Sequence, residues 1–198
     1  MGYWGYFVVG RAERPLAELD ALADAEGMTL RVSAPGGWQV WEYPSRDGAV
    51  GNMNALAAET GAPALFGYVM DSASAVVEAA GPQSGAWTAC LGRAAMAAHL
   101  GIGAEGGPGE GGDSGGGEDP ADGGDDGPVL EDYFLEPRDA AEWAVAWAAE
   151  AGHTVAVEPL LEVLSAQTET GAAASEAAGQ LAENLFFRLL DRLGVVPL

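Results

Sequence analysis

ALFGYVMDSASAVVEAAGPQSGAWTACL, residues 64–91, contains three short apolar runs separated by turn-forming residues. Asp71-Ser72-Ala73-Ser74 separates the first two runs, and Gly81-Pro82-Gln83-Ser84-Gly85 separates the second from the third. Short apolar runs bounded by Gly, Pro, Asp and Ser are typical of β-strands joined by tight turns. The stretch therefore predicts three consecutive strands, Ala64–Met70, Ala75–Ala79 and Trp87–Leu91.

The sequence before this stretch predicts three further strands and two helices. Tyr3–Val9 is apolar on both of its faces, as in a strand at the centre of a sheet. Leu16, Leu19 and Leu22 form one apolar stripe, which predicts a helix over Arg14–Glu26 that ends at Gly27. The remaining elements are a hairpin of Met28–Val32 with Trp38–Tyr43 and a helix over Met53–Thr60 that ends at Gly61.

A short helix over Arg93–Leu100 completes the element order βαββαβββα for residues 1–100. Strands and helices in this order predict an α+β fold. We expect a mixed or antiparallel sheet of about six strands, with the helices on one face.

Residues 101–128 form the clearest boundary in the chain. They contain 13 Gly, eight Asp or Glu and three Pro, with neither a basic nor an aromatic residue. Such a segment buries too little apolar surface to offset its ordering entropy, so we expect a disordered linker or an inserted loop. This boundary divides the chain into an α+β domain over 1–100 and a helical module over 129–198.

In the helical module, the sequence predicts three helices. The first begins at Pro137 and ends at Gly152, the second runs from Pro159 through Ala166, and the third spans Glu176–Leu193. Trp143 and Trp147 lie one turn apart on the first helix, and the last helix has a broad apolar stripe that includes Leu185, Phe186 and Leu189. About 70 residues is small for independent stability, so we expect the module to dock on the first domain and to bury both stripes.

Net charge is the strongest compositional feature. Thirty Asp and Glu accompany eight basic residues, all of them Arg, and the formal net charge is −22. This balance argues against nucleic acid and anionic membrane surfaces as partners, because phosphate contacts need clustered Arg or Lys. A basic partner protein is compatible with it, since an acidic surface speeds such encounters. Acidity that serves solubility alone is the other explanation.

No residue pattern indicates a catalytic centre, a metal site or a cofactor. Cys90 is the only cysteine and lies inside a predicted strand, so we expect a small buried residue rather than a nucleophile. His99 and His153 lack the spacing of metal ligands. GDSGG at 112–116 matches the peptide around a serine-protease nucleophile, but Ser114 lies in a polyglycine–acid tract that cannot preorganise an oxyanion hole.

The sequence predicts a cytoplasmic protein. No stretch approaches the roughly 20 apolar residues that span a bilayer, and residues 1–11 lack the pattern of a secretory signal peptide.

Two functional hypotheses remain open. One is a non-enzymatic protein-binding module for a basic partner, in which exposed aromatics such as Trp41 anchor the partner. Its steering acids would be Glu13, Glu18, Asp20 and Asp24. The other is a small-molecule enzyme or ligand-binding protein that uses Asp71, Ser72 and Tyr68, because functional side chains often follow a strand. Turn formation by Asp71 and Ser72 explains these two residues without a function.

LAAETGAPALFGYVMDS at 56–72 and MGYWGYFVV at 1–9 resemble small uncharacterised acidic proteins of Streptomyces and related actinomycetes. The size and acidity of the chain are also similar to those of immunity proteins, which neutralise toxins in bacterial conflict systems. The first resemblance implies no functional residue. The second is a likeness in character, and it implies a toxin-neutralising role for the binding module.

Overall fold

The computed structural model describes residues 2–46, 49–102, 127–168 and 181–198. Six strands form one antiparallel sheet in the order β2-β3-β1-β4-β5-β6: β1 (Gly5–Arg11), β2 (Thr29–Ala34), β3 (Trp38–Tyr43), β4 (Ala64–Met70), β5 (Ser74–Gly81) and β6 (Gly85–Leu91). The α-helices of the described residues are α1 (Met53–Thr60), α2 (Arg93–His99), α3 (Pro137–Glu150), α4 (Val157–Ser165) and α5 (Ala182–Arg192). The predicted α+β fold with a six-stranded sheet is confirmed.

β1 lies at the centre of the sheet, between β3 and β4. Its Val8 pairs with Phe66 of β4 on one side and with Trp41 of β3 on the other. Phe7 and Val9 are buried on one face of the sheet, and Val8 is buried on the opposite face. The apolar residues on both sides of this strand are therefore explained by its central position.

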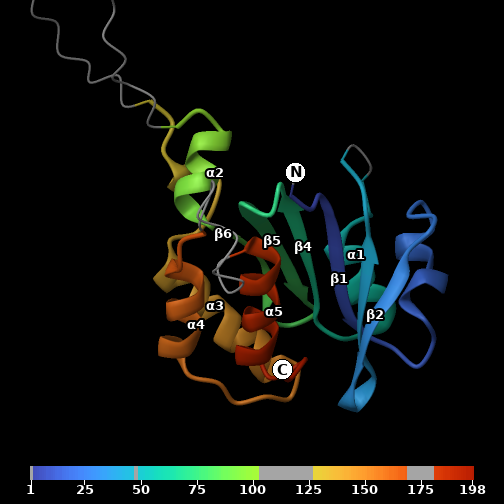
Figure 1. Cartoon of the computed structure of the whole chain (residues 1–198). Coiled ribbons are helices and arrows are strands. Elements are labelled where there is room, and N and C mark those ends of the chain that lie inside the picture. Colours follow the sequence, from blue (N-terminus) through green and yellow to red (C-terminus); the bar gives the residue numbers. More distant parts are fainter. Residues whose placement is uncertain (1, 47–48, 103–126, 169–180) are drawn as a thin grey trace, which may run out of the picture.

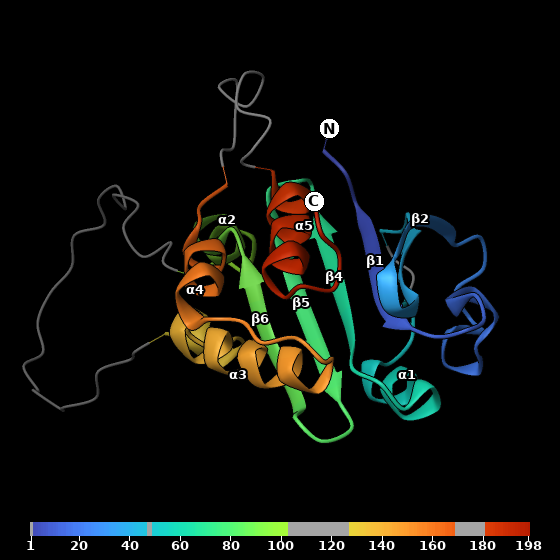
Figure 2. The same cartoon turned by 90° about the horizontal axis from the view of Figure 1, so that it is seen from below.

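Helices cover both faces of the sheet (Figures 1 and 2). α3, α4 and α5 pack on one face, which we call the first face, and share a core with side chains of β1 and β3–β6. α1 packs on the opposite, second face against Val8 and Phe66, and α2 lies on this face near Cys90. The helices of residues 1–100 thus share one face, as expected, and the later helices occupy the other.

The predicted helix over Arg14–Glu26 is wrong. The structure has two 3-10 turns there, η1 (Leu16–Glu18) and η2 (Asp20–Leu22), with extended backbone at Leu19 between them. The physical reason is the spacing of the apolar residues, because a 3-10 helix has three residues per turn and an α-helix has 3.6. The buried side chains of this segment recur every three residues, at Leu16, Leu19, Leu22 and Ala25.

A neighbouring helix also stabilises the second turn. The carboxylate of Glu59, near the end of α1, accepts hydrogen bonds from the N–H groups of Asp20 and Ala21 at 3.0 and 2.8 Å. These N–H groups therefore find their acceptors on α1 rather than in a preceding helical turn, which favours the observed conformation over a continuous α-helix.

The apolar stripe of α5 lies against the first face of the sheet. Leu185, Phe186 and Leu189 are fully buried. The ring of Phe186 stacks on Phe7, with 5.8 Å between the ring centroids. A Cβ atom added at Gly67 of β4 would lie 2.4 Å from this ring, so the missing side chain of Gly67 allows α5 to approach the strand closely.

The two tryptophans of α3 have different environments. Trp147 is fully buried, and its indole N–H donates to the carbonyl oxygens of Ala64 and Ala80, both at 3.2 Å. Trp143 is 42 % exposed, so the expectation that both tryptophans are buried is wrong for this residue. The reason is the strand order: Trp143 lies over β6, and in the described part of the chain no further strand follows β6 to cover it.

Several predictions concern residues outside those described. They are the structure of residues 103–126 of the proposed linker, including Ser114, and the start of the last helix at Glu176. Within the described ranges, no helix is both long and apolar enough to cross a membrane.

Candidate functional site

Within the described residues, β6 is an edge strand, with β5 on one side only. Thr88 pairs with Glu78 of β5, yet its carbonyl oxygen accepts a hydrogen bond from the N–H of Leu135, outside the sheet. Main-chain groups alternate in direction along an antiparallel strand. The N–H and C=O of Ala86, two residues before Thr88, therefore also point away from β5.

The chain returns to this edge just before α3. After the turn η4 (Leu130–Asp132), the N–H of Leu135 donates to the carbonyl oxygen of Thr88 at 3.0 Å. Arg93, the first residue of α2, donates to the carbonyl oxygen of Leu135 at 3.3 Å and forms an ion pair with Glu131. These contacts fix the segment 131–135 beside the middle of β6.

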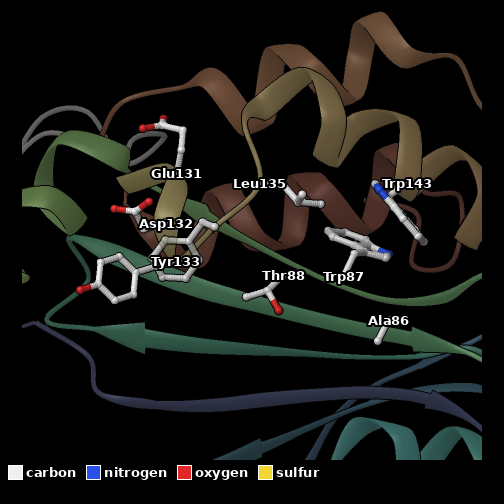
Figure 3. A pocket seen from close by; sticks show the side chains of 9 residues that line it. Ala86, Trp87, Thr88, Glu131, Asp132, Tyr133, Leu135 and Trp143 are labelled. Atoms are coloured by element: carbon white, nitrogen blue, oxygen red, sulfur yellow. The ribbon is translucent and has the colours of Figure 1, made fainter. Parts of the chain in front are cut away.

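A groove of about 400 Å³ lies between β6, this returning segment and α3 (Figure 3). We call it the β6 groove. A second groove, of about 320 Å³, lies along α3 on the other side of Trp143 and shares Leu135 and Trp143 with the first. The residues that line the β6 groove are Ala86, Trp87, Thr88, Glu131, Asp132, Tyr133, Phe134, Leu135 and Trp143.

Two large aromatic side chains of the β6 groove are open to solvent. Tyr133 is 54 % exposed and Trp143 is 42 % exposed. Figure 3 shows Tyr133 at one end of the groove and Trp143 at the other, with Thr88 and Trp87 between them. Exposed aromatic rings around a concave surface are typical of binding sites, where their burial anchors a partner.

Trp87 gives this groove a buried hydrogen-bond donor. The residue is only 4 % exposed, and within the described part of the chain its indole N–H has no hydrogen-bond partner. Buried indole N–H groups are usually hydrogen-bonded, since an unsatisfied donor costs about 1–3 kcal/mol. An acceptor that enters the groove would remove this cost.

The surface around the groove is acidic. Five acids and one arginine occur within residues 131–142. Glu131 and Asp132 line the β6 groove, and Asp139 and Glu142 line the second groove. No basic residue is among the described residues that line either groove, and the nearby Arg93 and Arg138 form ion pairs with Glu131 and Glu142. The two grooves together therefore present an aromatic surface with a negative potential.

Glu150 ties the end of α3 to the β5–β6 turn beside these grooves. Its carboxylate accepts hydrogen bonds from the N–H groups of Gln83 and Ser84, both at 2.8 Å. Burial raises the pKa of Glu150, but hydrogen bonds from Ser84 and Gln83 favour the charged form and leave the pKa below its ordinary value. The ionised side chain thus helps to hold α3 against β6.

Asp71 and Ser72 lie in the β4–β5 turn, where both have positive φ angles, 52° and 56°. The carboxylate of Asp71 accepts a hydrogen bond from the N–H of Gly2 at 2.8 Å. The hydroxyl of Ser72 accepts from the N–H of Tyr3 and donates to Glu183 of α5, both at 2.8 Å. These side chains join the turn to the start of the chain and to α5.

Tyr68, the third residue of the enzyme or ligand-binder hypothesis, lies on the second face. Its ring stacks on Tyr6, with 4.4 Å between the centroids, and its hydroxyl donates to the carbonyl oxygen of Arg46 at 2.9 Å. A pocket of about 490 Å³ beside α2 is lined by Asp71, Trp4 and His99 among others. Among the described residues that line it, neither Ser72 nor Tyr68 is present.

The structure does not bring the residues of the protein-binding hypothesis together in one site. Glu13 lines a separate surface groove near Gly36 and Gly61, while Glu18, Asp20 and Asp24 are exposed on and around the two 3-10 turns. Trp41 is half-buried and packs beside Val8, and its indole N–H donates to Gln39 at 2.8 Å. The structure thus places the acids on the surface and Trp41 largely within the core.

Cys90 is buried on the second face against Met96 of α2. Burial raises the pKa of its thiol to about 11, although the nearby Arg93 partly opposes this shift. The thiol is therefore protonated at neutral pH and is a poor nucleophile. Among the described residues, no group of three or more His, Cys, Asp and Glu side chains is arranged to hold a metal ion.

Comparison of the chain with protein-family models, with curated proteins and with solved structures finds no match.

The sequence reasoning did not find the β6 groove, because its two sides are far apart in the chain. Trp87 belongs to β6, whereas Tyr133 and Trp143 come after the acidic segment 101–128. One signal was present: Trp143 follows Glu142 directly and lies one turn after Asp139. A tryptophan beside two acids on an otherwise Ala-rich helix is less suited to a core than Trp147, which has Ala on both sides.

Proposed function

We propose that this protein is a non-enzymatic binding module for a basic partner protein, and that the β6 groove with the adjoining groove along α3 is its binding surface. One observation carries this proposal: the exposed rings of Tyr133 and Trp143 border a concave surface whose charged lining residues are acids. Aromatic rings and carboxylates both attract Lys and Arg side chains, the rings through cation–π contacts and the acids through Coulomb attraction.

The net charge of −22 supports the same class of partner. It raises the encounter rate with a cationic protein and disfavours nucleic acid and anionic lipid, whose phosphates it repels. The acids Glu18, Asp20 and Asp24 lie on a different part of the surface, so in this proposal they contribute to long-range steering only. We propose that the protein acts in the cytoplasm. More specifically, we propose that the basic partner is a toxin, which this protein neutralises as an immunity protein does.

The test is binding of the full chain to an array of synthetic decapeptides in which basic, acidic and neutral residues are varied. We expect binding to concentrate on peptides that combine Lys or Arg with aliphatic residues. The substitution Trp143→Ala should abolish this binding. Leu30→Ala, which changes an exposed apolar residue on β2 at the opposite edge of the sheet, should leave it intact.

Binding without any preference for basic peptides would overturn the proposal. Equal binding by the parent chain and by Trp143→Ala would overturn it as well, because the surface would then lie elsewhere. Far-UV circular dichroism of both variants verifies that they are folded.

A further inference from the structure

We propose that the basic partner contributes an extended segment, which binds as an added strand along the open edge of β6 and accepts a hydrogen bond from the indole N–H of Trp87. This inference rests on the proposed function and specifies the form of the ligand. It starts from the main chain of Gly85–Trp87, where β6 has no neighbouring strand on its outer side among the described residues.

The free main-chain groups define where such a segment would lie. The carbonyl oxygen of Thr88 already bonds the N–H of Leu135, so the returning chain occupies the edge at that point. The N–H and C=O of Ala86 point the same way, and Ala86 is itself exposed. An antiparallel residue placed opposite Ala86 can bond both groups, as in other cases of strand addition to a sheet edge.

Trp87 supplies an independent observation. Its side chain lies on the first face of the sheet and lines the groove, and its N–H is buried without a partner in the described part of the chain. Figure 3 places the indole of Trp87 along the strand between Thr88 and Ala86, beneath Trp143. A main-chain carbonyl of the added strand is the acceptor that this donor lacks.

The charge of the groove indicates which kind of segment binds at the edge of β6. A second copy of this chain would bring another acidic groove and a net charge of −22. The chain's own segment 103–126 carries eight acids and no base. Both are repelled by Glu131, Asp132, Asp139 and Glu142, whereas a segment with Lys or Arg on alternate residues is attracted. The segment is therefore a basic strand of another protein.

The experiment uses the full chain and a decapeptide of alternating lysine and valine, with the glutamate–valine peptide as its charge-reversed control. Two further peptides are methylated on main-chain nitrogens. In one of them every lysine carries the methyl group, and in the other every valine does. A strand bonds its neighbour through alternate residues only. We therefore expect one N-methylated isomer to bind at least about tenfold more weakly than the parent peptide and the other to bind with nearly unchanged affinity.

A second readout tests the contact with Trp87. In ¹H–¹⁵N spectra the indole resonance of Trp87 should move downfield when the lysine–valine peptide binds. Trp87→Phe keeps the ring in the core but removes the N–H, and it should weaken binding by about fivefold. Trp143→Phe is the matched control, and we expect it to change the affinity less.

The outcomes separate this inference from the proposed function. Equal binding of both N-methylated isomers, or an unmoved Trp87 resonance, overturns strand addition while the array result still stands. Failure of the unmodified peptide to bind, together with no Trp143-dependent binding on the array, overturns the proposed function. A dimer of the free chain that Trp143→Ala abolishes would show that a second copy occupies the edge and would overturn this inference.

Discussion

Phe186→Ala tests how α5 is held on the sheet. Phe186 is fully buried, stacks on Phe7 at 5.8 Å and meets Phe187 edge-to-face at 6.0 Å. Truncation of a buried Phe costs about 3–5 kcal/mol through lost transfer free energy and the cavity that remains. Two aromatic contacts add to this loss, so we expect a value near the upper end, about 4–5 kcal/mol.

Gly67 allows the same contact to be tested from the strand. A Cβ atom at this position would lie 2.4, 2.6 and 2.8 Å from three atoms of the Phe186 ring. Gly67→Ala should therefore cost about 1–3 kcal/mol, the usual range for overpacking a core. In the double variant the added methyl group occupies part of the cavity left by the ring. Its total loss should be at least about 1 kcal/mol smaller than the sum of the two single losses.

The assay is urea denaturation followed by far-UV circular dichroism, with free energies from linear extrapolation. Phe187→Ala is the matched control, because Phe187 is only partly buried and should cost less than Phe186. Strictly additive losses would refute the close contact between α5 and β4. Unchanged midpoints for Phe186→Ala would refute the packing of α5 on the first face altogether.

Three further predictions follow from contacts of α3 and β6. Glu150→Gln should lower the free energy of unfolding at pH 7. Because the folded pKa of Glu150 is depressed, its stabilising contribution is fully present above the unfolded pKa of about 4.3. The difference in stability between parent and variant should therefore disappear as pH falls through the folded pKa, as measured by denaturation at a series of pH values. Cys90 should resist Ellman's reagent at pH 8 in the native protein and react on unfolding in urea; prompt native labelling would contradict its burial. Trp147→Phe removes the donor that bonds the carbonyl oxygens of Ala64 and Ala80, and it should lower the free energy of unfolding by about 1–2 kcal/mol. A loss of stability no greater than that of Trp143→Phe, at an exposed position, would contradict these hydrogen bonds.

The strands and α1 could be predicted well because residues close in sequence determine where these elements begin and end. Gly81–Gly85 fixes the turn between β5 and β6, and the end of α1 lies at Gly61, whose φ of 65° suits glycine. Asn52 caps the start of α1 by accepting a hydrogen bond from the N–H of Ala55 at 3.1 Å. Such signals involve residues a few positions apart, so the sequence alone contains them.

The errors and the unrecognised site have a different origin. The sequence predicts an α-helix over Arg14–Glu26 because Leu16, Leu19 and Leu22 fit one helical stripe, although their spacing of three residues fits a 3-10 period better. The exposure of Trp143 depends on β6 being the last strand, and strand order is set by long-range pairing. The β6 groove has the same dependence, because it forms only when residues 131–143 pack beside residues 86–88.

Calorimetric titration of the full chain with the lysine–valine decapeptide, at low and at high salt, tests the central claim most directly. The account predicts saturable binding at one site, with an affinity that falls as salt increases, that is lost in Trp143→Ala and that is retained in Leu30→Ala. Absence of binding, or equal binding of the glutamate–valine peptide, would contradict a surface built for a basic partner.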